Sequence, residues 1–361
     1  MPPAPRRPAG ARPHSGLGAA RRLAPLLTVA ALFVLALGQV PVQPPADGSR
    51  GVETGRATSP VSTPITLLAA QRVELKRRQG YVTGDGRTRY VANRTEFRPR
   101  RATVALPPRL RGSAWIVVDL DTGRTLGRNA HRARLPQAST IKLLTALTAF
   151  RTIPPGTQHK VTRWEAGQVC SCVGLKPGRR YDRDTLVTGM LLRSGNDAAE
   201  AVAGAHPQGR SAFYAAMNAV ARELGASDTV AKNASGLSAW GSHSSARDLV
   251  LLLRAAVADP QVHAILSLTS AEIATIHGGH RRTVWRTTDY VNKVPGSLGK
   301  SGWTTPAQNT LTVVTEVEGR RIAFASLGVP TGYSTDGAIA LTTWAAQNLT
   351  GLASLGRLPG S

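Results

Sequence analysis

The chain of 361 residues contains only two cysteines and few acidic side chains. Two cysteines are too few for a small scaffold held by several disulfides, or for a zinc module built from cysteine. The 21 Asp and Glu residues face 45 Lys and Arg residues, and the formal net charge is +24. Such an excess first suggests a nucleic-acid partner. More than half of it lies in residues 1–112, however, and nearly all the basic residues are arginine, so we expect no nucleic-acid partner.

A basic segment followed by an uncharged one opens the chain. Residues 1–22 contain five arginines and no acid, and residues 23–40 form a run of 18 residues without a charge. As a helix this run would span about 27 Å, close to the hydrocarbon thickness of about 30 Å. We therefore expect residues 1–22 to be a basic cytoplasmic region and residues 23–40 to be a signal peptide or a membrane anchor. The rest is expected outside the cytoplasm, in the cell envelope, either anchored or secreted.

Composition divides the remaining chain into a spacer, a domain and a short end. Residues 41–112 are rich in proline and arginine and poor in apolar residues, which predicts a mostly extended tether. The tether is either a solvated spacer or a segment attracted to anionic envelope polymers or lipid head groups. Patterns of regular structure begin at residue 113, so we expect a folded domain over residues 113–350 and a tail over residues 351–361.

Apolar patterning predicts an α+β domain with strands at both ends and helices between them. Strands are expected at residues 114–120, 310–317 and 321–329. Helices are expected at residues 141–150, 184–192, 198–205, 212–224, 246–258 and 338–349.

Two motifs in the helical part bring hydroxyls close to an amine and an amide. Ser139 lies at the start of the apolar helix, and Lys142 follows it by one helical turn. A buried amine beside a hydroxyl can lose its proton and act as the base for that hydroxyl. Taken alone, however, the pattern favours Ser139 as a helix cap. The second motif supplies the hydroxyl of Ser194 and the amide of Asn196. Alone, it could be any polar turn.

A third motif precedes the final hairpin and combines a cation, hydroxyls and glycine. Lys300 and Ser301 can hold a carboxylate, and Gly302 lets a substrate backbone approach closely. Trp303 and Thr304 complete this segment. The motif also resembles the end of a phosphate-binding loop, but that loop needs a glycine where this chain has Val294.

In this order the motifs resemble those of the serine D-alanyl-D-alanine carboxypeptidases, low-molecular-mass penicillin-binding proteins of the β-lactamase/transpeptidase-like superfamily. The second motif follows the first by 55 residues, and the third follows the second by 106. The resemblance extends over about residues 113–350. Similar flanking segments lie at residues 118–123, 136–138, 175–178, 233–237 and 244–248.

The resemblance implies a cleft between an antiparallel five-stranded sheet with flanking helices and a helical subdomain. Ser139 would attack a D-alanyl-D-alanine bond of a peptidoglycan stem peptide, and Lys142 would take its proton. Ser194 and Asn196 would relay the proton and position the peptide. β-Lactam antibiotics would be covalent inhibitors, and neither a metal nor a cofactor is implied.

The third motif would bind the substrate. Lys300 and Ser301 would engage its terminal carboxylate, with Gly302, Trp303 and Thr304 beside it. The backbone N–H groups of Ser139 and Trp303 would form the oxyanion hole.

Three alternatives remain open. Relatives commonly have an arginine after the last hairpin that holds the substrate carboxylate, and residues 328–343 contain none, which leaves a D,D-endopeptidase open. A class A β-lactamase would need a Glu-x-x-x-Asn arrangement between the second and third motifs, and the sequence has none there. A non-catalytic envelope-binding protein is the third.

Other reactive side chains have less support. Cys170 and Cys172 are expected on a strand-like segment, either as free thiols or as a strained local disulfide. His277 and His280 could be read as a metal pair, but we interpret them as surface residues. A Ser-His-Asp triad finds no Gly-x-Ser-x-Gly segment to support it.

Overall fold

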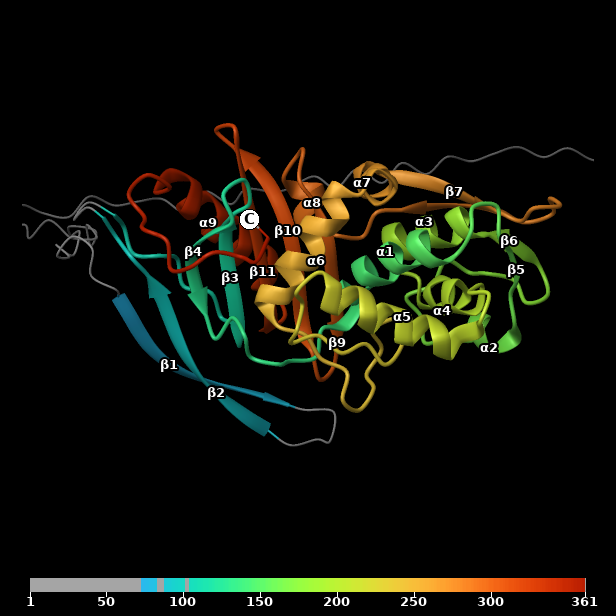
Figure 1. Ribbon diagram of the computed structural model, residues 1–361, viewed down its shortest axis with the longest axis horizontal. Coiled ribbons are helices and arrows are strands. Elements are labelled where there is room, and N and C mark those ends of the chain that lie inside the picture. Colours follow the sequence, from blue (N-terminus) through green and yellow to red (C-terminus); the bar gives the residue numbers. More distant parts are fainter. Residues whose placement is uncertain (1–72, 83–87, 101–103, 361) are drawn as a thin grey trace, which may run out of the picture. The chain divides into compact units, whose positions relative to one another are not determined.

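The computed structural model describes residues 73–82, 88–100 and 104–360 (Figure 1). The predicted cytoplasmic region, the apolar segment 23–40 and the first part of the tether lie outside these residues. Within the described residues no single helix is long and apolar enough to cross a membrane. One bent pair of helices passes that test of length and composition together; the first of the pair is buried in the core.

A sheet of seven strands organises the domain, in the order β1-β2-β4-β3-β11-β10-β9, with every neighbouring pair antiparallel (Figure 1). The α+β prediction is confirmed, and the sheet has two strands more than the five expected. The strands are β1 (Val73–Val82), β2 (Thr88–Phe97), β3 (Ala114–Asp119), β4 (Arg124–Asn129), β9 (Leu298–Thr304), β10 (Gln308–Val317) and β11 (Arg320–Val329).

The prediction of an extended tether is wrong for the part of it that contains β1 and β2. The end of β2 pairs with β4, and Phe97 is fully buried with its ring edge-on to Trp344 at 5.9 Å. The prolines that suggested an extended chain lie before residue 65 and after residue 98, so the stretch between them is free to form strands. Averaging the composition over residues 41–112 concealed this.

The predicted tail is also wrong, because residues 351–360 pack on the sheet. Leu352 and Leu358 are buried, and the backbone N–H of Leu355 donates to the Thr125 carbonyl at 2.9 Å. The backbone N–H of Ala353 donates to the Arg98 carbonyl at 2.7 Å. Two apolar residues six apart are too weak a pattern to predict such packing from sequence.

Both faces of the sheet are covered, which explains the unbroken apolar run in β3. Ile116 and Val118 face a core that contains helix α6 (Ala246–Ala258), whereas Trp115 and Val117 face a second core beneath helix α9 (Ser334–Gln347). Side chains of a strand alternate between faces, so a strand with two covered faces is apolar throughout. Helix α8 (Asp289–Lys293) packs beside α9.

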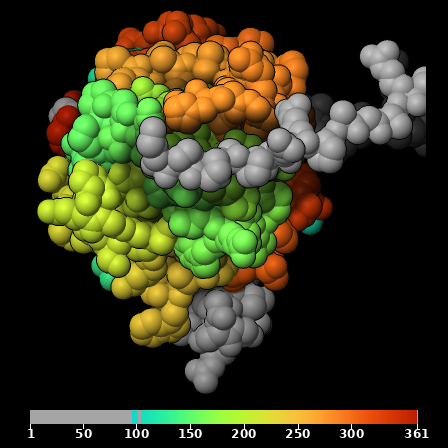
Figure 2. Space-filling model, turned by 90° about the vertical axis from the view of Figure 1, so that its right-hand side faces the viewer, coloured from blue at the N-terminus to red at the C-terminus, as the bar shows by residue number. Residues whose placement is uncertain are grey.

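The remaining helices lie beyond β9, at the opposite edge of the sheet from β1 (Figure 1). The central helix α1 (Lys142–Thr152) is buried along its first eight residues and contacts α3, α4, α5 and α6. Figure 2 looks onto this region, where the orange segment with hairpin β7–β8 lies next to the green segment with α3. The elements are α2 (Arg163–Ala166), α3 (Arg183–Arg193), α4 (Asn196–Gly204), α5 (Gly209–Glu223), α7 (Pro260–Ser267), β5 (Gln158–Lys160), β6 (Arg180–Asp182), β7 (Ser270–Ala274) and β8 (Arg281–Trp285).

Candidate active site

Ser139 lies in a tight 3₁₀ turn, Ala138–Ile141, that leads into α1. It does not cap the helix, because no side-chain cap hydrogen bond is formed at this end. Instead, its Oγ accepts a hydrogen bond from Lys142 Nζ at 2.7 Å. The backbone of Ala138 has a positive φ of 47°, which an alanine rarely adopts, so the surrounding contacts hold this turn in a strained conformation.

Lys142 is completely buried and has three oxygen partners. Besides Ser139, its Nζ donates to Asn196 Oδ1 at 2.8 Å and to the Ser235 backbone carbonyl at 2.5 Å. The amide and carbonyl oxygens can only accept, so they take two N–H groups of the amine. In the neutral amine the remaining lone pair therefore faces Ser139 Oγ. This arrangement suits the removal of a proton from the hydroxyl.

Burial also favours the neutral form of Lys142. Its pKa is well below the usual value, first because burial removes water from the ammonium and second because the Lys300 ammonium repels it. Glu200 and Asp197 act in the opposite direction, since their negative charges favour the ammonium.

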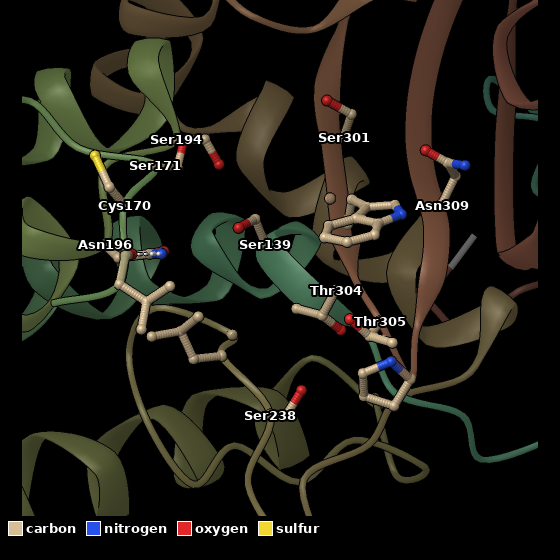
Figure 3. Close-up of a pocket in the computed structure, with 16 residues that line it drawn as sticks. Ser139, Cys170, Ser171, Ser194, Asn196, Ser238, Ser301, Thr304, Thr305 and Asn309 are labelled. Atoms are coloured by element: carbon tan, nitrogen blue, oxygen red, sulfur yellow. Dashed lines mark hydrogen bonds between the residues drawn. The ribbon is translucent and has the colours of Figure 1, made fainter. Parts of the chain in front are cut away.

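Ser194 and Asn196 are brought to the site by a sharp reversal between α3 and α4. Ser194 ends α3 in the left-handed conformation, with φ of 59°, and Asn196 begins α4. Gly195 between them leaves no room for a side chain, because an added Cβ would lie 2.4 Å from Val173 Cγ2. The reversal puts the Ser194 hydroxyl and the Asn196 amide on the same wall of the site (Figure 3).

Lys300 reaches the site from β9 and is also fully buried. Its Nζ donates to Ser194 Oγ at 3.0 Å and to the Ser301 carbonyl at 2.8 Å. Burial lowers the pKa of Lys300 to about 7. The site thus contains two hydrogen-bonded pairs of a hydroxyl and a buried amine, Ser139 with Lys142 and Ser194 with Lys300.

The rest of the third motif forms the opposite wall of the cleft. Gly302 is required for the close approach of β9 to the turn, because an added Cβ would lie 2.6 Å from the Ser139 backbone nitrogen. Thr310 Oγ1 on β10 donates to the Gln137 carbonyl at 3.0 Å and ties the sheet to the same turn. The side chain of Trp303 is 58% exposed, at the edge of the cleft.

A cavity of about 710 Å³ opens above Ser139. Figure 3 shows Ser139 at its centre, with Ser194 and Asn196 on one side and Ser301 and Thr304 on the other. Lys142 and Lys300 do not line the cavity but lie behind these hydroxyls. The lining residues are Ser139, Val169, Cys170, Ser171, Ser194, Asn196, Gly236, Leu237, Ser238, Ser301, Gly302, Trp303, Thr304, Thr305, Pro306 and Asn309.

The structure therefore brings together all nine residues that the three motifs nominated, although they come from separate parts of the chain. Seven of them line the cavity. The two lysines lie behind these residues, where Lys142 bonds to Ser139 and Asn196, and Lys300 bonds to Ser194 and the Ser301 carbonyl.

Sequence reasoning missed Glu200, which supports Lys142 from beneath. Glu200 Oε1 accepts hydrogen bonds from the backbone N–H groups of Ala234 and Ser235, at 3.2 and 3.1 Å. It thereby fixes the loop whose Ser235 carbonyl binds Lys142. Glu200 follows Asn196 by four residues on α4, so both lie on one helix face, and that spacing was the available signal.

Cys170 and Cys172 form a disulfide, with their Cα atoms 4.7 Å apart. The expected strand-like segment is wrong, since these residues lie in an irregular loop at the cleft. His277 lies exposed in the turn between β7 and β8, with His280 at its end. No cluster of three or more His, Cys, Asp or Glu side chains that could hold a metal ion occurs in the described part of the chain.

Comparisons with known proteins agree with this geometry. The family model of the D-alanyl-D-alanine carboxypeptidases, peptidase family S11, matches residues 101–331. D-alanyl-D-alanine carboxypeptidase DacB2 of Mycobacterium tuberculosis is 37% identical over 217 residues, which cover 59% of this chain and 73% of that protein. DacD of Escherichia coli, another D-alanyl-D-alanine carboxypeptidase, is 30% identical over 280 residues, 72% of this chain and 68% of that protein.

One solved structure is similar to this chain in both fold and sequence. The crystal structure of a D-alanyl-D-alanine carboxypeptidase from Mycobacterium tuberculosis H37Rv superposes with a TM-score of 0.66 and 33% identity, over 72% of this chain and 99% of that one. The family match covers well over half of this chain and includes all three motifs. The chain therefore belongs to the D-alanyl-D-alanine carboxypeptidase family, the penicillin-binding serine hydrolases that act on peptidoglycan.

Proposed function

We propose that Ser139 is the nucleophile of a D-alanyl-D-alanine carboxypeptidase that cleaves peptidoglycan stem peptides through an acyl-enzyme. The observation that supports this most directly is the hydrogen bond between Ser139 Oγ and the buried amine of Lys142, whose lowered pKa favours its neutral form. Attack of Oγ on the carbonyl of the penultimate D-alanine transfers the hydroxyl proton to Lys142. The proton then passes through Ser194 to the amine of the departing D-alanine.

Hydrolysis of the acyl-enzyme uses the same groups in reverse. A water molecule takes the place of the departed D-alanine, and Lys142, neutral again, removes its proton. Attack of this water on the ester restores the Ser139 hydroxyl and releases the shortened peptide. The backbone N–H groups of Ser139 and Trp303 would stabilise the negative oxygen in both steps, since the approach of β9 to the turn brings these two segments together.

The cavity favours a peptidase over a β-lactamase. None of the residues that line it is Asp or Glu, so no carboxylate stands at its wall to activate a deacylating water. Glu200 is buried beneath the site, where it binds two backbone N–H groups and the hydroxyl of Tyr214. We therefore expect the adduct with penicillin to be long-lived.

Replacing Ser139 by alanine should abolish both acylation by penicillin and cleavage of the stem peptide, because the Ser139 hydroxyl is the proposed nucleophile in both and alanine has none. With Ser139→Ala we expect no covalent adduct with labelled penicillin by mass spectrometry and no release of D-alanine from a pentapeptide stem. Ser267→Ala, a serine at the end of α7 outside the cleft, serves as the matched control and should retain both. Labelling that persists in Ser139→Ala would refute the assignment.

A second activity, D,D-endopeptidase cleavage, is favoured because the cavity wall offers no cationic side chain to bind the terminal carboxylate of a substrate. The cavity lining contains neither Arg nor Lys, and Lys300 stands behind Ser194 and Ser301. Hydroxyls bind a carboxylate and a neutral amide with more similar strength than a guanidinium does. We propose that the same cleft also cleaves peptides in which the terminal carboxyl is amide-linked.

The two activities can be compared with one pair of substrates. We expect kcat/KM for a pentapeptide stem to fall less than roughly tenfold when its terminal carboxylate is replaced by an amide. Released D-alanine and D-alaninamide are measured by chromatography. A loss greater than about a hundredfold would contradict the endopeptidase proposal and leave a strict carboxypeptidase.

Glu200 should tune the pH dependence of acylation through Lys142. In Glu200→Gln the negative charge is lost while an oxygen remains for the two backbone N–H groups. The Lys142 ammonium is then less stabilised and its pKa falls. Since acylation needs the neutral amine, the acid limb of kcat/KM should move to lower pH, by up to about one pH unit.

The matched control for this measurement is Glu96→Gln. Glu96 on β2 is also buried and pairs with Arg128 at 2.7 Å, away from the loop at Ser235, whereas Glu165 shares Arg210 with Glu200 and is unsuitable. Glu96→Gln should leave the acid limb in place. An unmoved limb in Glu200→Gln, or equal movement in both folded variants, would contradict the role assigned to Glu200.

We also propose that residues 23–40 remain as a membrane anchor that holds the domain in the envelope. The 18 uncharged residues match the membrane thickness, and the arginines before them favour a cytoplasmic N-terminus. We expect the chain to stay in the membrane pellet after a carbonate wash, and a chain without residues 1–40 to be released. A mature chain that begins after residue 38 would instead indicate a cleaved signal.

A further inference from the structure

The Cys170–Cys172 disulfide closes a loop that forms one wall of the cleft. Val169, Cys170 and Ser171 all line the cavity, and Figure 3 shows Cys170 and Ser171 on the same side as Asn196. The side chain of Val169 is 70% exposed and that of Cys170 is also exposed. The disulfide is therefore open to reagents in solution, although it adjoins the reacting groups.

This loop determines how the Asn196 amide is oriented. Asn196 Nδ2 donates to the Val169 carbonyl at 2.6 Å, and the Asn196 backbone N–H donates to the Ser171 carbonyl at 2.7 Å. With its NH₂ group on Val169, the amide presents Oδ1 to Lys142 Nζ, at 2.8 Å. A flipped amide would direct its NH₂ group at the amine, so two donors would face each other and Lys142 would lose one of its acceptors.

Besides the disulfide, only a few hydrogen bonds hold the first half of this loop: Ser171 Oγ donates to the Arg193 carbonyl at 3.0 Å, and Asn196 donates to the Val169 and Ser171 carbonyls. Residues 168–172 belong to neither a helix nor a strand, and the exposed Val169 side chain has few atoms to pack against. The second half is held separately, because Asp197 accepts the backbone N–H groups of Val173, Gly174 and Leu175 at 2.8–3.0 Å. The bond from Cys170 to Cys172 ties the residue after Val169 to the residue before the segment that Asp197 holds, and so restricts the position of the Val169 carbonyl.

We propose that the Cys170–Cys172 disulfide is a positioning element of the active site, which orients Asn196 toward Lys142, and that its reduction slows acylation of Ser139. This inference rests on the function proposed above for Ser139 and Lys142. Reduction by a dithiol transfers two electrons and two protons to the disulfide, which becomes two thiols, while the reagent is oxidised to its cyclic disulfide. The enzyme then responds to the thiol–disulfide balance around it.

The experiment compares acylation of the full chain by a fluorescent penicillin before and after reduction with dithiothreitol, at a temperature where both forms remain folded by circular dichroism. We expect reduction to lower the second-order rate constant roughly tenfold, because Lys142 is then aligned for a smaller fraction of time. Reoxidation should restore the rate. Equal rates in the oxidised and reduced protein would overturn the proposal.

Two variants separate the disulfide from other effects of the reductant. The double variant Cys170→Ser/Cys172→Ser should acylate as slowly as the reduced protein and be insensitive to dithiothreitol. Ser171→Ala keeps the disulfide and both carbonyls, so it should remain sensitive. A double variant that acylates as fast as the oxidised protein would overturn the proposal even if the reduced protein unfolds.

A third variant tests whether the effect passes through Asn196. In Asn196→Ala the oriented amide is missing, so acylation should already be slow and reduction should change it less than about twofold. A further tenfold loss on reduction of this variant would mean that the disulfide supports the cleft in some other way, against the positioning role. If no adduct forms at Ser139 in the oxidised parent protein, the proposed function fails, and this outcome is distinct from all of the above.

Discussion

The active site depends on keeping an amine in a place without water. Lys142 is fully buried, with a second buried lysine close enough to repel its ammonium. Removing water from a charged amine is costly, and the protein lowers that cost by favouring the neutral form. The same burial that would destabilise an ordinary lysine therefore prepares this one to accept a proton from Ser139.

Such an amine needs support that satisfies its N–H groups without restoring its charge. Asn196 Oδ1 and the Ser235 carbonyl are neutral acceptors, and they hold Nζ by hydrogen bonds. The charge that balances the site lies further away, on Glu200 and Asp197, which act on Lys142 through space while bonding to backbone N–H groups. Separating geometry from charge in this way fixes the amine firmly but leaves its pKa low.

The fold holds the buried amine in place because the sheet and the helical region meet at the turn that carries Ser139. β9 lies against the turn that carries Ser139, and the closeness is possible because Gly302 has no side chain. From the helical side, the α3–α4 reversal delivers Ser194 and Asn196, and Lys300 reaches across from the sheet to Ser194. The site thus exists only where the sheet and the helical region meet, and the disulfide-closed loop borders it on the helical side.

The sequence by itself determined the chemistry and the general architecture. The residue types at the three motifs, together with their order, were enough to nominate Ser139, Lys142, Lys300 and their neighbours, because reacting groups must be of particular kinds. Alternation and helical periodicity were enough for the α+β class. Only the tertiary structure decided the rest. The end of β2 joins the main sheet by pairing with β4, and the Ser235 carbonyl and Glu200 act through contacts made by folding. Cys170 and Cys172 pair because an irregular loop brings them together. These features arise from long-range contacts, many of them to backbone atoms that every residue possesses. Local patterns of side chains therefore do not specify them, and only Glu200 had a local signal, its spacing of four residues from Asn196.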